Sequence, residues 1–214
     1  MELKLNIPNS LNEITLGQYQ EFEKLDLTNE SKVHLKMIEI FCNVPEIVAR
    51  NIKATDVAEI CGIINNMFET KHQLINSFKL EGQEYSFIPS LQDMSFGEYI
   101  DLDTFIGDTE NLHRAMNVLY RPIELKQGKR YTLKEYDPES NEIAKDFPLD
   151  AVLGAIVFFY SLGKDLSLTM MNSLDKANQE TLAQHLISHP NTDGTTASLQ
   201  SLTEILQSLN ISLN

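Results

Sequence analysis

Residues 14–25 read ITLGQYQEFEKL, and a related stretch, MSFGEYIDLDTF, follows eighty positions later at residues 94–105. Most aligned pairs keep their chemical class, and two are identical. The identical pairs are Gly17 with Gly97 and Tyr19 with Tyr99. The match extends upstream, where an Ile-Pro pair stands at residues 7–8 and again at residues 88–89. The chain therefore contains two related segments, and this relationship decides how the rest of the sequence is interpreted.

The match also extends downstream of the two stretches. Five further residues of the first segment have counterparts of the same type, in the same order, in the second. They are His34, Met37, Ile40, Phe41 and Pro45, which face His113, Met116, Leu119, Tyr120 and Pro122. The sequence predicts an internal duplication, and we expect residues 7–45 and 88–122 to fold as one repeated unit.

Both segments open with the signals of a helix N-terminus. Each has a good N-cap residue followed three positions later by Gln or Glu, which is the pattern of a capping box. The boxes are Thr15 with Gln18 and Ser95 with Glu98. The apolar residue before each cap can pack on the tyrosine of the first turn, so we expect Tyr19 and Tyr99 to be buried. For Gly17 and Gly97, we expect a need for room beside a neighbouring backbone.

The apolar periodicity predicts an α+β fold that is mainly helical. Helices are expected at about residues 16–26, 30–43, 45–51, from a cap at Thr55, at 96–106 and 109–120, from Pro148 to Gly163, and on to Ile187. Short strands are expected at residues 3–7 and in two hairpins that turn at Glu81-Gly82 and Gln127-Gly128.

These elements predict two related strand-plus-helix units followed by a helical C-terminal part. The predicted divisions are a first unit at 1–78, a second unit with hairpins at 79–136, an apolar helical region at 137–188, a linker at 189–198 and an amphipathic helix at 199–214.

Composition argues against several classes of function. The chain has 31 acidic and 17 basic residues and a formal net charge of −14, and such a field repels nucleic acid and anionic membranes. Its most apolar run, residues 151–162, is shorter than the roughly 20 residues that a membrane-spanning helix needs. Cys42 and Cys61 stand among apolar neighbours, so we expect two reduced thiols in the core of a cytosolic protein.

No motif that carries catalysis is found. The sequence has no phosphate-binding loop, dinucleotide-binding fingerprint or nucleophile elbow. His34 and His113 hold equivalent positions in the repeat, but each stands among apolar residues of a predicted helix. His185 and His189 lack a third ligand nearby, which argues against a metal site. We expect no enzymatic activity, no cofactor and no metal.

Two segments have the character of interaction surfaces. One is a basic cluster that contrasts with the acidic chain: Arg121, Lys126, Lys129, Arg130 and Lys134. We expect it to meet acidic protein surface, in this molecule or another, with nucleic acid as the alternative. The other is the C-terminal helix, whose apolar side carries Leu199, Leu202, Ile205, Leu206 and Leu209. The pattern leaves open whether this helix packs on its own core or docks on another chain.

Two motifs in the second half of the chain carry a resemblance. Residues 112–123 read LHRAMNVLYRPI, and FPLD at residues 147–150 leads into FFY at residues 158–160. Over about residues 85–165, these motifs resemble proteins from the structural gene clusters of tailed bacteriophages. Members of such families are small, helical and acidic, and they serve as virion proteins or tail assembly chaperones.

The resemblance implies phage assembly or virion architecture through protein contacts, with a tail assembly chaperone favoured. A stably incorporated connector or tail subunit is the alternative. The implied partners are other phage structural or assembly proteins, with a homo-oligomer left open. The implied location is the host cytoplasm during assembly, or the virion. A nucleic-acid-associated or regulatory protein that uses the basic segment 121–134 is the competing class.

Overall fold

The computed structural model describes residues 5–25, 28–128 and 130–173, with side chains placed as far as Lys164. The α-helices are α1 (Leu16–Glu23), α2 (Glu30–Phe41), α3 (Glu46–Ala49), α4 (Ala54–Phe68), α5 (Phe96–Phe105), α6 (Leu112–Leu119) and α7 (Leu149–Ser173). The 3-10 helices are η1 (Leu11–Glu13), η2 (Leu91–Asp93), η3 (Thr109–Asn111) and η4 (Pro138–Asp146). The strands are β1 (Ser77–Leu80), β2 (Gln83–Phe87), β3 (Tyr120–Gln127) and β4 (Arg130–Leu133). The predicted α+β, mainly helical class is confirmed.

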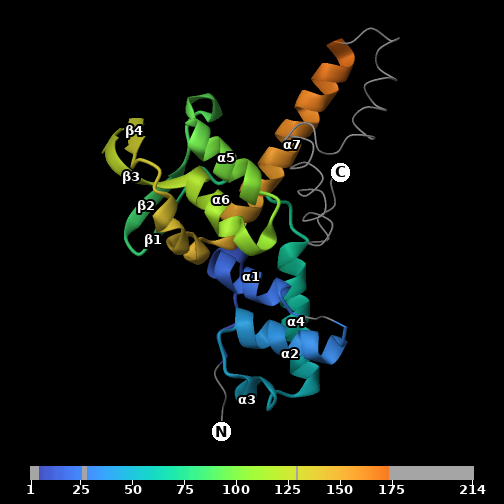
Figure 1. Ribbon diagram of the computed structural model, residues 1–214. Helices are drawn as coiled ribbons and strands as arrows, with labels where there is room; N and C mark the ends of the chain where they lie inside the picture. The colour runs from blue at the N-terminus through green and yellow to red at the C-terminus, as the bar shows by residue number, and fades with distance from the viewer. Residues whose placement is uncertain (1–4, 26–27, 129, 174–214) are drawn as a thin grey trace.

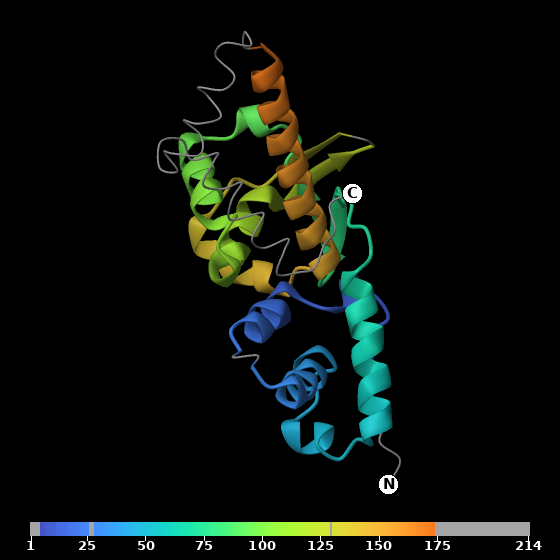
Figure 2. The ribbon, with the colours of Figure 1, turned by 90° about the vertical axis from the view of Figure 1, so that its right-hand side faces the viewer.

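The described part of the chain forms two lobes (Figures 1 and 2). Helices α2, α3 and α4 lie in one lobe. The sheet, α5 and α6 lie in the other, and α1 lies between the two. Helix α7 starts near α1, passes the second lobe and continues beyond it (Figure 1). The two related helices thus differ in position: α1 lies between the lobes, whereas α5 lies on the outer side of the second lobe.

The four strands form one antiparallel sheet in the order β1-β2-β3-β4. Glu81 and Gly82 make the first two-residue turn with φ of 50° and 85°, which is the left-handed backbone that a tight hairpin favours. Both predicted hairpins are confirmed. The sequence did not reveal that they join through β2 and β3, where Phe87 lies opposite Tyr120.

An aromatic core lies between the sheet and α7. The rings of Phe87 and Tyr120 meet edge-on at 5.2 Å between centroids, and Phe158 of α7 packs on Phe87 at 5.6 Å. The Tyr120 hydroxyl donates a hydrogen bond to the carbonyl of Ile75 at 2.8 Å. Burial raises the pKa of this phenol. A buried polar group needs such a partner, so this bond lets Tyr120 enter the core.

The first turns of α7 are anchored deeply, and a glycine makes this possible. Residues 151–156 are all buried. At Gly154, a Cβ would overlap the carbonyl of Gln73 and also touch Leu74. The segment after α4 therefore lies directly against the helix backbone, a contact that only glycine allows.

A short bridge ties the start of α1 to the start of α7. Thr15 pairs with Pro148 in antiparallel fashion. The Leu16 amide donates to the Phe147 carbonyl, and the Leu149 amide donates to the Ile14 carbonyl, each at 2.9 Å. Residues far apart in the sequence thus meet where both helices begin.

The predicted repeat shares its element order over part of its length. A 3-10 helix, a capped helix and a second α-helix occur in this order as η1-α1-α2 and again as η2-α5-α6, where the 3-10 helix η3 is inserted before α6. Both capping boxes are confirmed, with reciprocal bonds between Thr15 and Gln18 and between Ser95 and Glu98. The segments then diverge, because Pro45 caps α3 whereas Pro122 lies within β3.

The paired glycines also differ. A Cβ at Gly17 would lie 3.2 Å from the Lys145 carbonyl oxygen, so the predicted need for room is confirmed there. At Gly97 nothing lies within 4 Å of the same position. The prediction for Gly97 is therefore wrong for the described fold, in which no backbone packs on that side of α5.

Other local predictions need correction. Residues 5–7 form no strand. Helix α4 begins after Lys53, and Thr55 instead bonds to Asp56. Helix α7 runs through Gly163 without ending, because the cost of one helical glycine, about 1 kcal/mol, is small. The predictions for Lys129, His185, His189, the linker 189–198 and the helix 199–214 fall outside the described residues.

Candidate protein-docking surface

The outer face of α5 carries large apolar side chains that the described fold does not cover. Phe96 is 78% exposed, Tyr99 is 47% exposed and Ile100 is 45% exposed. Residues three and four apart lie on the same side of a helix, so the three side chains form one strip. We call Phe96, Tyr99 and Ile100 the α5 ridge. Large apolar side chains gathered in one exposed patch mark an interaction site more often than isolated ones do.

The inner face of α5 combines the buried Leu102 with two carboxylates that are bonded to the fold. Buried Glu98 accepts a bond from the Ser95 amide at 2.6 Å and one from Arg121 of β3 at 2.8 Å. Asp101 accepts a bond from the Tyr136 hydroxyl at 2.7 Å. These bonds hold carboxylates against the fold and turn the apolar ridge outward.

The related helix α1 shows the opposite arrangement. Leu16, Tyr19 and Gln20 hold the positions that correspond to the ridge, and they are 0%, 1% and 5% exposed. Tyr19 packs near Phe68 of α4, with 6.4 Å between ring centroids. The same helical face is therefore covered in the first copy and open in the second.

The prediction that Tyr19 is buried is confirmed, and the prediction for Tyr99 is wrong. The physical reason lies in the neighbours. Helix α1 lies between the lobes, where Gln20 donates to the Thr109 carbonyl at 2.8 Å. Helix α5 has no lobe on its outer side, and its ion pair with Arg121 fixes which face turns inward.

The basic cluster lies along the β3–β4 hairpin, and ion pairs within the chain engage two of its members. Arg121 contacts Glu98, and Lys126 contacts Glu84 at 2.6 Å. Arg130 and Lys134 are exposed. The positive charge available to a polyanion is reduced accordingly. That the cluster serves as an interaction site stays a prediction.

The two ion pairs are expected to differ in their contribution to stability. Changing Arg121 to Gln leaves the Glu98 carboxylate buried without its cation, and we expect a loss of about 1–3 kcal/mol in unfolding free energy. Lys126 lies half exposed, so Lys126→Gln is expected to cost less than about 1 kcal/mol. Urea denaturation of both variants measures the difference. Equal losses would show that the Arg121 pair is not a structural contact.

Packing accounts for His113 and for the two cysteines. Burial lowers the pKa of His113, whose Nδ1 lies 3.2 Å from the Gln20 amide. Burial raises the pKa of the Cys42 thiol to about 11, and Cys61 is also buried and free. Within the described part of the chain, no three His, Cys, Asp or Glu residues gather as metal ligands would.

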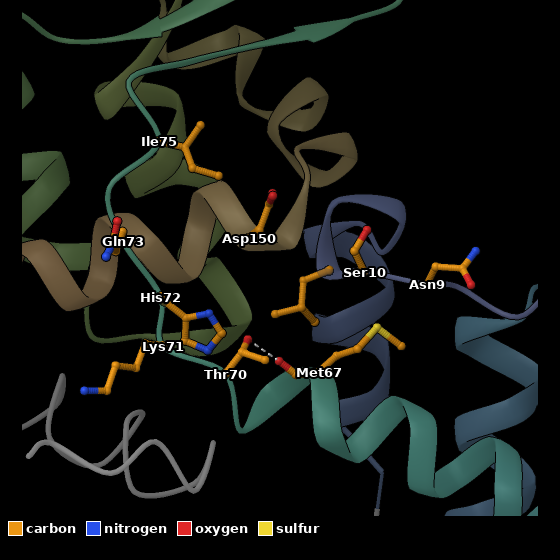
Figure 3. A pocket seen from close by; sticks show the side chains of 10 residues that line it. Asn9, Ser10, Met67, Thr70, Lys71, His72, Gln73, Ile75 and Asp150 are labelled. Atoms are coloured by element: carbon orange, nitrogen blue, oxygen red, sulfur yellow. Dashed lines mark hydrogen bonds between the residues drawn. The ribbon is translucent and has the colours of Figure 1, made fainter.

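A pocket of about 370 Å³ lies where the end of α4 approaches the start of α7 (Figure 3). Its size is within the range of small-molecule sites. Burial lowers the pKa of His72 and raises the pKa of Asp150 at this pocket. However, the Thr70 hydroxyl donates to the Met67 carbonyl at 2.7 Å, and Lys71 extends away from the other side chains. Two of the polar residues that line the pocket are therefore not directed into it.

Sequence reasoning missed the α5 ridge as a site. Both faces of this helix carry large apolar residues, with Phe96 and Ile100 on one side and Leu102 and Phe105 on the other. Periodicity alone cannot choose between two such faces. The Glu98 carboxylate completes the capping box, which explains its presence in the sequence. Its second bond, to Arg121, joins residues far apart in the chain, and no local pattern indicates it.

Comparison with protein-family models, with curated proteins and with solved structures gave no match. Among the helices of the described residues, none combines the length and apolar character needed to cross a bilayer. The site is therefore interpreted from its own geometry.

Proposed function

We propose that this chain is a non-enzymatic protein that acts by binding other proteins, with the α5 ridge as the docking surface. The observation that supports this most directly is the orientation of α5, with the Glu98 carboxylate held inward by Arg121 and Phe96 held outward. Full burial of a side chain such as Phe96 contributes about 1.5–3 kcal/mol, and most of this is forgone while Phe96 is 78% exposed. A partner that covers the ridge recovers part of this free energy.

The surroundings of the ridge define the chemistry of the partner. Residues 91–111 contain six acidic residues and no Lys or Arg. A partner that presents apolar side chains flanked by basic ones complements this surface in both packing and charge. Aromatic residues at such a surface are typical anchors of protein interfaces.

The more specific proposal is a role in bacteriophage assembly, with other phage structural or assembly proteins as partners. It is supported by the resemblance of residues 112–123 and 147–150, and a tail assembly chaperone remains the favoured version. A stably incorporated connector or tail subunit is the alternative. Mass spectrometry of purified virions separates the two, because a chaperone is absent from the particle and a subunit is present in fixed copy number.

Site-specific photo-crosslinking tests the docking surface. With p-benzoylphenylalanine in place of Tyr99, we expect one defined partner to be crosslinked in the producing cells. Adding Phe96→Ser should lower the yield roughly tenfold, because interface anchors of this type contribute more than about 1.4 kcal/mol.

The matched control is Ile47→Ser, which removes an apolar side chain of α3 that is 68% exposed and far from α5 in the chain. It should leave the yield unchanged. If Ile47→Ser lowers the yield as much as Phe96→Ser, or if no protein is crosslinked at position 99, the ridge is not the docking surface.

A further inference from the structure

We propose that residues 199–209 of the same molecule cover the α5 ridge and compete with the partner for it. This inference rests on the proposed function, and it adds a regulatory segment from within the chain. The described fold leaves Phe96, Tyr99 and Ile100 open, and the chain continues for 41 residues beyond Ser173.

The apolar pattern of the segment fits the ridge. Leu199, Leu202, Leu206 and Leu209 follow one another at intervals of three, four and three, which places them on one side of a helix. The ridge residues Phe96, Tyr99 and Ile100 have helical spacings of the same kind. Two helices with such strips can pack ridge into groove.

Charge favours this segment over a second copy of α5. Residues 199–214 contain a single ionisable side chain, Glu204. Of the six acidic residues in segment 91–111, Glu98 and Glu110 form ion pairs within the chain. A second copy would instead bring the other four against the same four, and like charges across an interface are repulsive. The nearly neutral segment is therefore the better occupant of an apolar ridge in an acidic surrounding.

The chain is long enough to reach the ridge. Twenty-five residues separate Ser173 from Leu199, and an extended chain of that length spans up to about 80 Å. Helix α7 is itself only about 37 Å long at 1.5 Å per residue, and it rises past the lobe that carries α5 (Figure 1). A tethered segment also acts at a high effective concentration, on the order of millimolar. Docking within one molecule is thus favoured over docking between molecules in dilute solution.

Crosslinking of the purified full chain tests the proposal. We mix equal amounts of ¹⁴N- and ¹⁵N-labelled protein, each with p-benzoylphenylalanine at position 99, irradiate, and identify the joined peptides. The expected product joins position 99 to a peptide within residues 199–209, with both halves carrying the same isotope. Products that join the two isotopes would identify a second copy as the occupant. No product in this segment would also overturn the proposal.

Paired substitutions test the contact itself. Leu202→Glu with Leu206→Glu should reduce the intramolecular product roughly tenfold or more, since a carboxylate is costly to bury against Phe96. Gln200→Glu with Gln207→Glu adds the same charge on the opposite side of the predicted helix and should leave the product in place. Equal losses in both variants would refute the contact.

The same variants in producing cells separate this proposal from the proposed function. With Leu202→Glu and Leu206→Glu, the yield of the crosslinked partner should rise, because the competitor is removed. A partner yield that does not change would overturn the competition while leaving the docking function standing. An intramolecular product without any partner in cells would overturn the docking function and the competition, and would leave only the contact of residues 199–209 with the ridge.

Discussion

Replacing Tyr19 by alanine is expected to lower the unfolding free energy by about 3–5 kcal/mol, the usual cost of truncating a buried aromatic residue. Tyr19 is 1% exposed. It packs near Phe68, which in turn lies 6.0 Å from Phe41 between ring centroids. The cavity would therefore open at the contact of α1, α2 and α4. Urea denaturation with a fixed m-value measures the change.

Tyr99→Ala is the matched control, because the repeat places the same residue at the same helical position. Because Tyr99 is 47% exposed, we expect its replacement to lower the unfolding free energy by less than about 1 kcal/mol. The pair thus separates the stability contribution of one copy from the surface role of the other. Equal and large losses would show that Tyr99 is packed, and the docking surface would then have to be given up.

Gly154→Ala is expected to cost about 3 kcal/mol, at the upper end of what overpacking a core costs. The new methyl group would overlap the Gln73 carbonyl, so either α7 or the segment after α4 must move. Both lobes meet near this contact. The atoms that the methyl group would meet belong to the backbone, so no flexible side chain can move aside to relieve the overlap. The thermal midpoint and urea denaturation should both record the loss.

Gly62→Ala provides the opposite result within the same molecule. Gly62 lies in the middle of α4, and nothing lies within 4 Å of the position of its missing Cβ. Without a clash, alanine should stabilise the helix by roughly 0.5–1 kcal/mol. A neutral or stabilising Gly154→Ala would show that α7 does not approach the Gln73 backbone in solution.

Several short-range features could be predicted from the sequence. The capping boxes at Thr15 and Ser95 and the hairpin at Gly82 depend on residues within four positions of each other. Their chemistry is complete in the local sequence, so the pattern determines the structure.

Features that depend on distant residues could not be predicted. The orientation of α5 is set by Glu98 and Arg121, which are 23 positions apart, and this orientation decides whether Tyr99 is core or surface. The start of β3 has a similar cause. The sequence predicts a helix that runs to residue 120, but α6 ends at Leu119 and Tyr120 begins β3, because Tyr120 pairs with Phe87 in the sheet.

The bridge between Thr15 and Pro148 has a consequence for how the chain is made. A ribosome adds about 5–20 residues per second, so the partner of Thr15 is synthesised on the order of 10 s after Thr15 itself. During that interval, the hydrogen bonds from Leu16 to Phe147 and from Leu149 to Ile14 cannot form. Helix α1, the first α-helix of the chain, therefore completes its contacts only after the start of α7, the last described helix, has been synthesised.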